Sequence, residues 1–98
     1  MKTVGLDTHI IDALMRDLVG HDRRPAAFIV YLWLWRCTVG ADRNSIGLSL
    51  QDISRATGLS KSAVQASVKR LTQRRLISAS RAAPTYAPIY KVYAPWKD

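Results

Sequence analysis

Residues 49–77 read SLQDISRATGLSKSAVQASVKRLTQRRLI, and this stretch predicts two helices joined by a tight turn, the second leading directly into a strand. Ser49 and Asp52 have the spacing of a capping box, in which each side chain accepts from the other residue's backbone N–H, so the first helix is expected to begin there. Gly58 is expected to end that helix, because glycine adopts a left-handed conformation without a Cβ penalty. Ser60 then stands where a second helix needs its N-cap. The pattern predicts a helix-turn-helix.

The second helix combines an apolar stripe with a polar outer face. Val64, Val68 and Leu71 recur at helical spacing and are expected to face the core. The outer face carries Gln, Lys and Ala, which in a major groove bond to adenine, bond to guanine or phosphate, and touch the thymine methyl group. We therefore predict that this face contacts double-stranded DNA, the alternative being an ordinary solvated helix. The expected DNA-binding residues are Ser60, Lys61, Ser62, Gln65, Ala66, Lys69, Arg70, Gln73, Arg74 and Arg81.

Within this set, two roles are expected. Gln65 and Lys69 project from the groove-facing side of the helix, where base edges are read. Arg70 and Arg74 lie toward its flank, where side chains contact phosphate and carry no sequence information. Sequence preference is therefore expected to depend on the first pair, and general affinity on the second.

The run GLSKSAVQASVKRLTQRRLI, residues 58–77, resembles the recognition helix and following strand of winged helix-turn-helix proteins, such as MarR-like and related small bacterial regulators. The resemblance implies a mainly α fold with a small β-hairpin, the wing, whose tip touches phosphate or the minor groove. Many relatives have Gly just before the Leu-Ile that opens the wing, whereas this chain has Arg75. A left-handed Arg75 would cost roughly 1–2 kcal/mol relative to Gly.

Positive charge is concentrated in the half of the chain that contains this motif. Residues 1–48 hold six Lys or Arg and five Asp, a net charge of +1, whereas residues 49–98 hold nine Lys or Arg and two Asp, a net charge of +7. A basic patch attracts polyanions by releasing their condensed counterions, which favours nucleic acid as the partner. No segment has the wide apolar face of a lipid-binding helix, so no membrane partner is expected.

The cysteine content and the apolar segments indicate a cytoplasmic protein. Cys37 is the only cysteine, so no intramolecular disulfide can form, and it is expected to be a small buried apolar residue. The first six residues are too short and too mixed for a signal peptide. The densest apolar run, residues 26–35, is shorter than the roughly 20 residues that cross a bilayer.

The N-terminal half is expected to begin with a helix over residues 8–19. Asp7 or Thr8 has the character of an N-cap, and Gly20 is expected to end the helix. A short polar link, residues 21–24, follows. The apolar residues expected on one side of this helix are Ile10, Ile11, Leu14 and Leu18.

A second helix is expected over residues 25–39, with Pro25 at its first position. It has no polar face over two turns, and a helix that is apolar all round should be buried all round. One explanation is a central core helix with the first helix folded over it. The other is burial in a second chain, because Trp and Tyr are enriched at such contacts. We predict a homodimer through helices 8–19 and 25–39, with Tyr31, Trp33 or Trp35 at the contact.

Three short strands are expected around the wing. The resemblance implies a short strand over residues 46–48. Residues 76–80 and 89–93 have the composition of strands. The loop between the last two, residues 81–88, contains two prolines that keep it out of regular pairing. The aromatic residues expected to brace the wing against the body are Tyr86, Tyr90, Tyr93 and Trp96.

The sequence gives no basis for catalysis. His9 and His21 lie far apart and lack a Cys or carboxylate at metal-ligand spacing, and no glycine-rich phosphate loop is present. No metal site, cofactor or enzymatic activity is therefore expected. The absence of Glu further reduces the prospect of a paired-carboxylate site.

Together these patterns predict a single winged helix-turn-helix domain over residues 1–98. Residues 1–44 supply the N-terminal helices and a dimerisation surface, and residues 45–98 supply the helix-turn-helix and wing. The predicted function is sequence-specific binding of double-stranded DNA by a small transcriptional regulator. The alternatives are the DNA-binding module of a plasmid or phage replication protein and a winged-helix module that binds other proteins.

Overall fold

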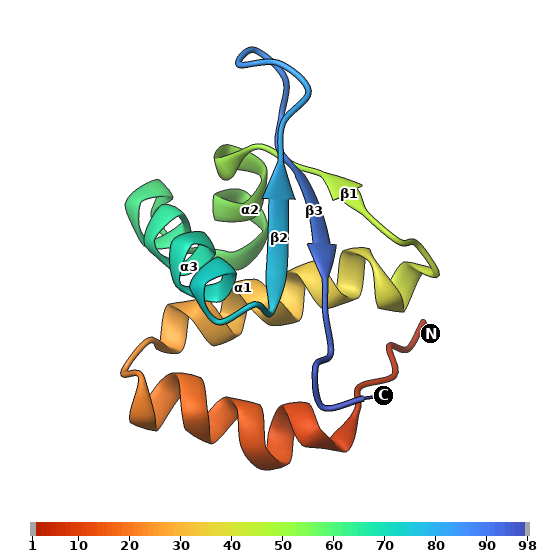
Figure 1. The fold of residues 1–98 in the computed structure, drawn as a ribbon, viewed down its shortest axis with the longest axis vertical. Helices are drawn as coiled ribbons and strands as arrows, with labels where there is room; N and C mark the ends of the chain where they lie inside the picture. Colours follow the sequence, from red (N-terminus) through yellow and green to blue (C-terminus); the bar gives the residue numbers. More distant parts are fainter. Residues whose placement is uncertain (1, 98) are drawn as a thin grey trace.

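An apolar helix forms the centre of the fold in the computed structural model, which describes residues 2–97. This helix, α1 (Pro25–Cys37), begins at a proline and buries about half of its side chains. The N-terminal helix lies along one side of α1, and α2, α3 and the sheet lie on the other side (Figure 1). The structure therefore supports a central core helix that the first helix covers. The buried residues of α1 are Ala27, Phe28, Val30, Tyr31, Leu34 and Trp35.

The N-terminal helix is wider than an α-helix. It consists of η1 (Ile10–Leu14) and η2 (Arg16–His21), whose hydrogen bonds reach back five residues, as in the bond from the Asp22 N–H to the Asp17 carbonyl at 2.8 Å. This wide turn brings every fourth residue to the buried side of the helix, which faces α1. Ile11, predicted on the buried side, is consequently rotated outward and 44% exposed. The buried residues of this helix are Ile10, Leu14 and Leu18.

The prediction that Gly20 ends this helix is wrong. The helix continues to His21, and the chain reverses at Arg23, whose φ of 55° is left-handed. The Arg24 N–H donates to the Leu18 carbonyl at 2.7 Å and closes the turn. Because an arginine supplies the left-handed residue, Gly20 is an ordinary member of the helix.

The first helix of the helix-turn-helix, α2 (Leu50–Thr57), begins and ends where its caps predict. The Ser49 N–H donates to the Asp52 carboxylate at 2.9 Å, and the Asp52 N–H donates to the Ser49 hydroxyl at 3.0 Å. Gly58 follows with a φ of 80° and donates its N–H to the carbonyl of Ser54. The predicted capping box and left-handed glycine are both confirmed.

The second helix, α3 (Lys61–Gln73), is capped by Ser60, whose hydroxyl accepts from the Ala63 N–H at 3.1 Å. Its stripe differs in one position from the prediction, because Val68 is only half-buried while Ser67 is buried. The Ser67 hydroxyl donates to the Ala63 carbonyl at 2.7 Å, so a polar group is buried there without loss of its hydrogen bond. The predicted stripe residues that are buried are Val64 and Leu71.

Three antiparallel strands form a sheet in the order β1-β3-β2, with β1 (Ile46–Gly47), β2 (Ile77–Ser80) and β3 (Ile89–Val92). All three predicted strands are confirmed within a residue at each end. β2, β3 and the loop between them form the wing, and this loop projects beyond the body of the molecule (Figure 1). Between α3 and β2, Arg75 has a φ of 58°, so the left-handed conformation considered for it is present without a glycine.

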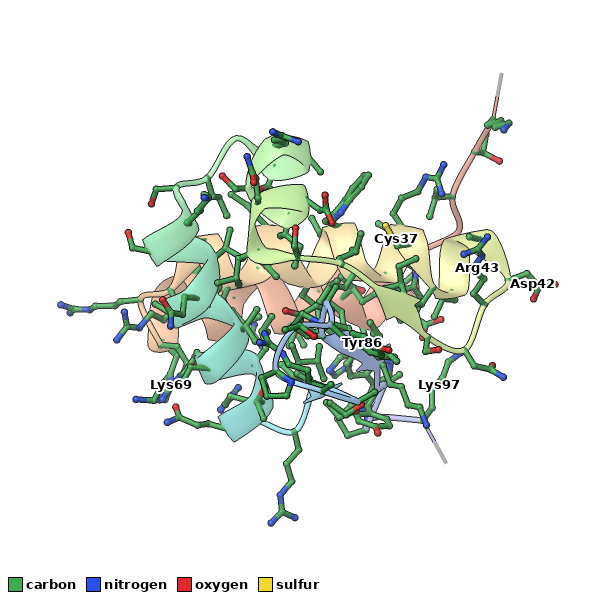
Figure 2. The ribbon with its side chains drawn as sticks, turned by 90° about the horizontal axis from the view of Figure 1, so that it is seen from above. Cys37, Asp42, Arg43, Lys69, Tyr86 and Lys97 are labelled. Atoms are coloured by element: carbon green, nitrogen blue, oxygen red, sulfur yellow. The ribbon has the colours of Figure 1, made fainter. Side chains whose placement is uncertain are left out.

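Several aromatic side chains lie elsewhere than the predicted contact between chains and the predicted bracing of the wing would place them. Of the three aromatic residues expected at a contact between chains, Tyr31 and Trp35 are 0% and 3% exposed and belong to the core, and Trp33 is half-buried and packs against it. The Tyr31 hydroxyl donates to the Tyr93 carbonyl at 2.8 Å, which fastens the segment after β3 to α1. Tyr90 is buried and braces the wing as predicted, but Tyr86 is 63% exposed because it lies in the projecting loop (Figure 2).

Gly58→Ala is expected to lower the free energy of unfolding by about 1–2 kcal/mol, because an L residue is strained at this left-handed position. Gly20→Ala is expected to raise it by about 0.5–1 kcal/mol, because alanine favours a helix interior and no atom lies within 4 Å of its added Cβ. Urea denaturation measures both changes. A loss of stability in Gly20→Ala would contradict the position of the helix end.

Candidate nucleic-acid interface

The outer face of α3 is exposed as predicted. Lys69 extends from it away from the body of the molecule (Figure 2). The hydroxyls of Ser60 and Ser62 lie 3.2 Å apart at its N-terminal end. Ala66, whose side chain is a single methyl group, leaves room for a close approach along the middle of the helix. The exposed residues of this face are Lys61, Ser62, Gln65, Ala66, Lys69 and Gln73.

The wing places a further cation beside the first turn of α3. Arg81 and Lys61 line one open cavity of 490 Å³, between the start of α2, the start of α3 and the wing loop. A second cavity of 260 Å³ lies between α3 and the wing strands, and Gln65 and Arg81 both line it. Arg81 donates from Nη1 to the Pro84 carbonyl at 3.2 Å, which holds its side chain against the wing.

On the opposite flank, Arg70 of α3 and Arg74 at its C-cap are tied to the N-terminal half. Asp22, in the link between η2 and α1, has a side chain that is fully buried. Its Oδ2 atom accepts from Nε of Arg70 at 3.1 Å and lies 3.4 Å from Nε of Arg74. Both contacts are made through Nε, the inner nitrogen of the guanidinium group. Arg70 and Arg74 remain 37% and 35% exposed.

The charged state of Asp22 follows from these neighbours. Burial raises the pKa of its carboxyl, but hydrogen bonds from His21 and Arg70 and the positive charges of Arg74 and Arg70 lower it more. The pKa therefore lies below its ordinary value, and the group is a carboxylate at neutral pH. It offsets part of the positive charge on the flank of α3 while fixing the direction of both arginines.

The structure thus places the ten predicted DNA-binding residues along α3, at its cap and on its two flanks. Sequence reasoning missed two neighbours of this surface, Asp22 and Arg24, because both were assigned to a polar link. Arg24 lines a cavity together with Lys69 and Arg70. The pair of adjacent arginines at positions 23 and 24 was the only signal in the sequence.

Three further expectations concern features outside this surface. Cys37 is half-buried rather than fully buried, and burial raises the pKa of its thiol more than the charges of Arg36 and Arg43 lower it. Within residues 2–97, no three His, Cys, Asp or Glu side chains are placed to hold a metal ion. In the same range, every helix is too short or too polar to cross a membrane.

The capped helix pair, the exposed outer face of its second helix and the three-stranded sheet with its wing define a winged helix-turn-helix domain. The model of the MarR family matches residues 40–84, which contain β1, α2, α3 and β2, so this segment is similar to the corresponding part of that family. The crystal structure of the AntR antimony-specific transcriptional repressor has a similar fold, with a TM-score of 0.54 and 21% identity. The match covers 88% of this chain but 65% of the AntR chain, so this chain spans about two thirds of that length. No curated protein matches the chain.

Proposed function

We propose that this protein binds double-stranded DNA with sequence preference by placing α3 in the major groove, and that it acts as a small transcriptional regulator. The observation that carries the proposal is the outer face of α3, where Gln, Lys and Ser side chains stand exposed opposite a buried stripe. These side chains have the donors and acceptors that read base edges. The basic side chains on both flanks of α3 distinguish it from an ordinary solvated helix.

The net charge and the similarity to known proteins support the same function. The net charge of +7 in residues 49–98 favours a polyanionic partner. The match to the MarR family supports a non-enzymatic regulator, and the structural neighbour is described as a transcriptional repressor. The single cysteine is consistent with a reducing compartment, and we propose a cytoplasmic location on that ground.

Gln65→Ala is expected to relax the preference for one base pair of the site, by roughly 1–3 kcal/mol of discrimination, because a paired contact to a base edge is lost. Asn44→Ala, which removes an exposed side-chain amide outside the candidate interface, is the matched control and should leave the consensus unchanged. Selection from random duplexes, followed by binding measurements at two salt concentrations, compares the variants. Absence of wild-type binding at low salt would contradict the function, and an unchanged consensus for Gln65→Ala would contradict the orientation of α3.

We also propose that the 98 residues act as one domain that forms a homodimer through its N-terminal half. A surface stripe supports this: Ile11, Met15 and Val19, spaced by four, are each 39–44% exposed on the outside of the N-terminal helix. A twofold axis at Met15 would place Ile11 against the partner's Val19. Asp12 would then approach the partner's Arg16, which adds a charge pair at the edge. This stripe replaces the buried aromatic residues as the proposed contact, and two protomers would read two half-sites.

Met15→Asp is expected to convert the dimer into a folded monomer that binds DNA more weakly, because a charge cannot be buried at the centre of the stripe. Val39→Asp makes the same kind of change at another exposed apolar residue and should leave the assembly unchanged. Sedimentation equilibrium at micromolar concentration gives the mass. A wild-type mass that stays at 11.0 kDa at every concentration would refute the dimer.

A further inference from the structure

A basic cavity lies on the flank of α3 that faces away from the wing. It has a volume of 300 Å³ and is more enclosed than the hollow on the outer face of the helix. Within residues 2–97, neither Arg24 nor Lys69 forms an ion pair, and Arg70 is paired only with Asp22. No carboxylate lines the cavity. The residues that line it are Arg24, Ala66, Lys69, Arg70 and Gln73.

We propose that this cavity, the phosphate pocket, seats one phosphate of the DNA backbone in each half-site; the inference rests on the proposed function. A helix in the major groove lies between two sugar-phosphate backbones, about 12 Å apart. Lys61 and Arg81 face the backbone on the wing side. The phosphate pocket stands on the other side of the same helix, where the second backbone must pass.

The surroundings of the pocket prepare it for an anion. The Asp22 carboxylate accepts from Nε of Arg70, which fixes the guanidinium and leaves its Nη groups to donate elsewhere. The backbone of Arg24 is held as well, because its N–H donates to the Leu18 carbonyl and its own carbonyl accepts from the Ala27 N–H, so the side chain starts from a fixed point at the edge of the cavity. Donors that are held in place before binding lose less conformational entropy when the ligand arrives.

The N-terminal half would therefore take part in DNA recognition directly. Arg24 belongs to the link before α1, whereas Lys69 and Arg70 belong to α3. Lys69, predicted from the sequence to face base edges, is here assigned to phosphate. A phosphate held between them would fix the register of α3 along the groove without reading any base. Arg24 is thereby assigned a role that its position in a polar link does not indicate.

Arg24→Gln removes one cation of the pocket and leaves the Asp22–Arg70 pair in place. Arg36→Gln is the matched control: Arg36 is exposed at the other end of α1 and loses the same charge. Log Kd is measured against log salt on the selected duplex and on unrelated duplexes. Arg24→Gln is expected to weaken binding to all sequences alike and to reduce the salt slope by about 0.9 per protomer, whereas Arg36→Gln should keep the wild-type slope.

A scan of the duplex with single neutral methylphosphonate linkages identifies the phosphate itself. A neutral linkage at one position per half-site, on the backbone away from the wing, should weaken DNA binding by the wild type. The same linkage should not further weaken DNA binding by Arg24→Gln. Equal slopes for the two variants, or equal sensitivity of wild type and Arg24→Gln at every linkage, would overturn the phosphate pocket while leaving the proposed function intact. Failure of the wild type to bind any duplex would overturn the function itself.

Discussion

The buried Asp22 carboxylate ties the N-terminal half of this fold to α3 through two arginines. An ionised group without water is unstable unless it is paired and hydrogen-bonded, so Asp22 requires the arginines that reach it from α3. Arg70 and Arg74 lie one turn apart, and both direct Nε to the same oxygen atom. The position of α3 is thereby tied to the link that precedes α1. A displacement of the helix would leave a buried charge without its partners.

The apolar core explains how such a small chain can hold this arrangement. α1 can be apolar over most of its surface because the N-terminal helix covers one face, and α2, α3 and the sheet cover the other (Figure 1), although Ile29 stays 40% exposed. The wide π-type turns of the first helix align Ile10, Leu14 and Leu18 against it. The same turns rotate Ile11 outward. The surface stripe of the N-terminal helix and the core beneath it therefore have one geometric cause.

Local signals in the sequence were sufficient to predict the helix-turn-helix. The capping box at Ser49 and Asp52, the left-handed Gly58 and the Ser60 cap each act over about four residues, so their effect can be read from adjacent positions. The exposed face of α3 followed from helical spacing. Its role in binding DNA stays a prediction, as do the dimer and its contact.

Long-range contacts could not be predicted in the same way. Asp22 and Arg70 are separated by 48 positions, and nothing near either residue indicates the other. Gly20 was predicted to end its helix because glycine is the usual left-handed residue, but the hydrogen bonds of the turn impose that conformation on Arg23. Whether an aromatic residue is buried also depends on the whole fold, which is why Tyr31 and Tyr86 were both misplaced.

The central claim, that Asp22 holds α3 in place through Arg70, is tested most directly by a double-mutant cycle of Asp22→Asn and Arg70→Gln in urea denaturation. Because the folded pKa of Asp22 is lowered, its contribution is present above the ordinary carboxyl pKa and is lost as pH falls through the lowered value. We predict that Asp22→Asn costs about 1–3 kcal/mol at pH 7, that this cost shrinks as pH falls below about 4, and that the two substitutions are strongly non-additive. Additive losses that do not change with pH would contradict the account.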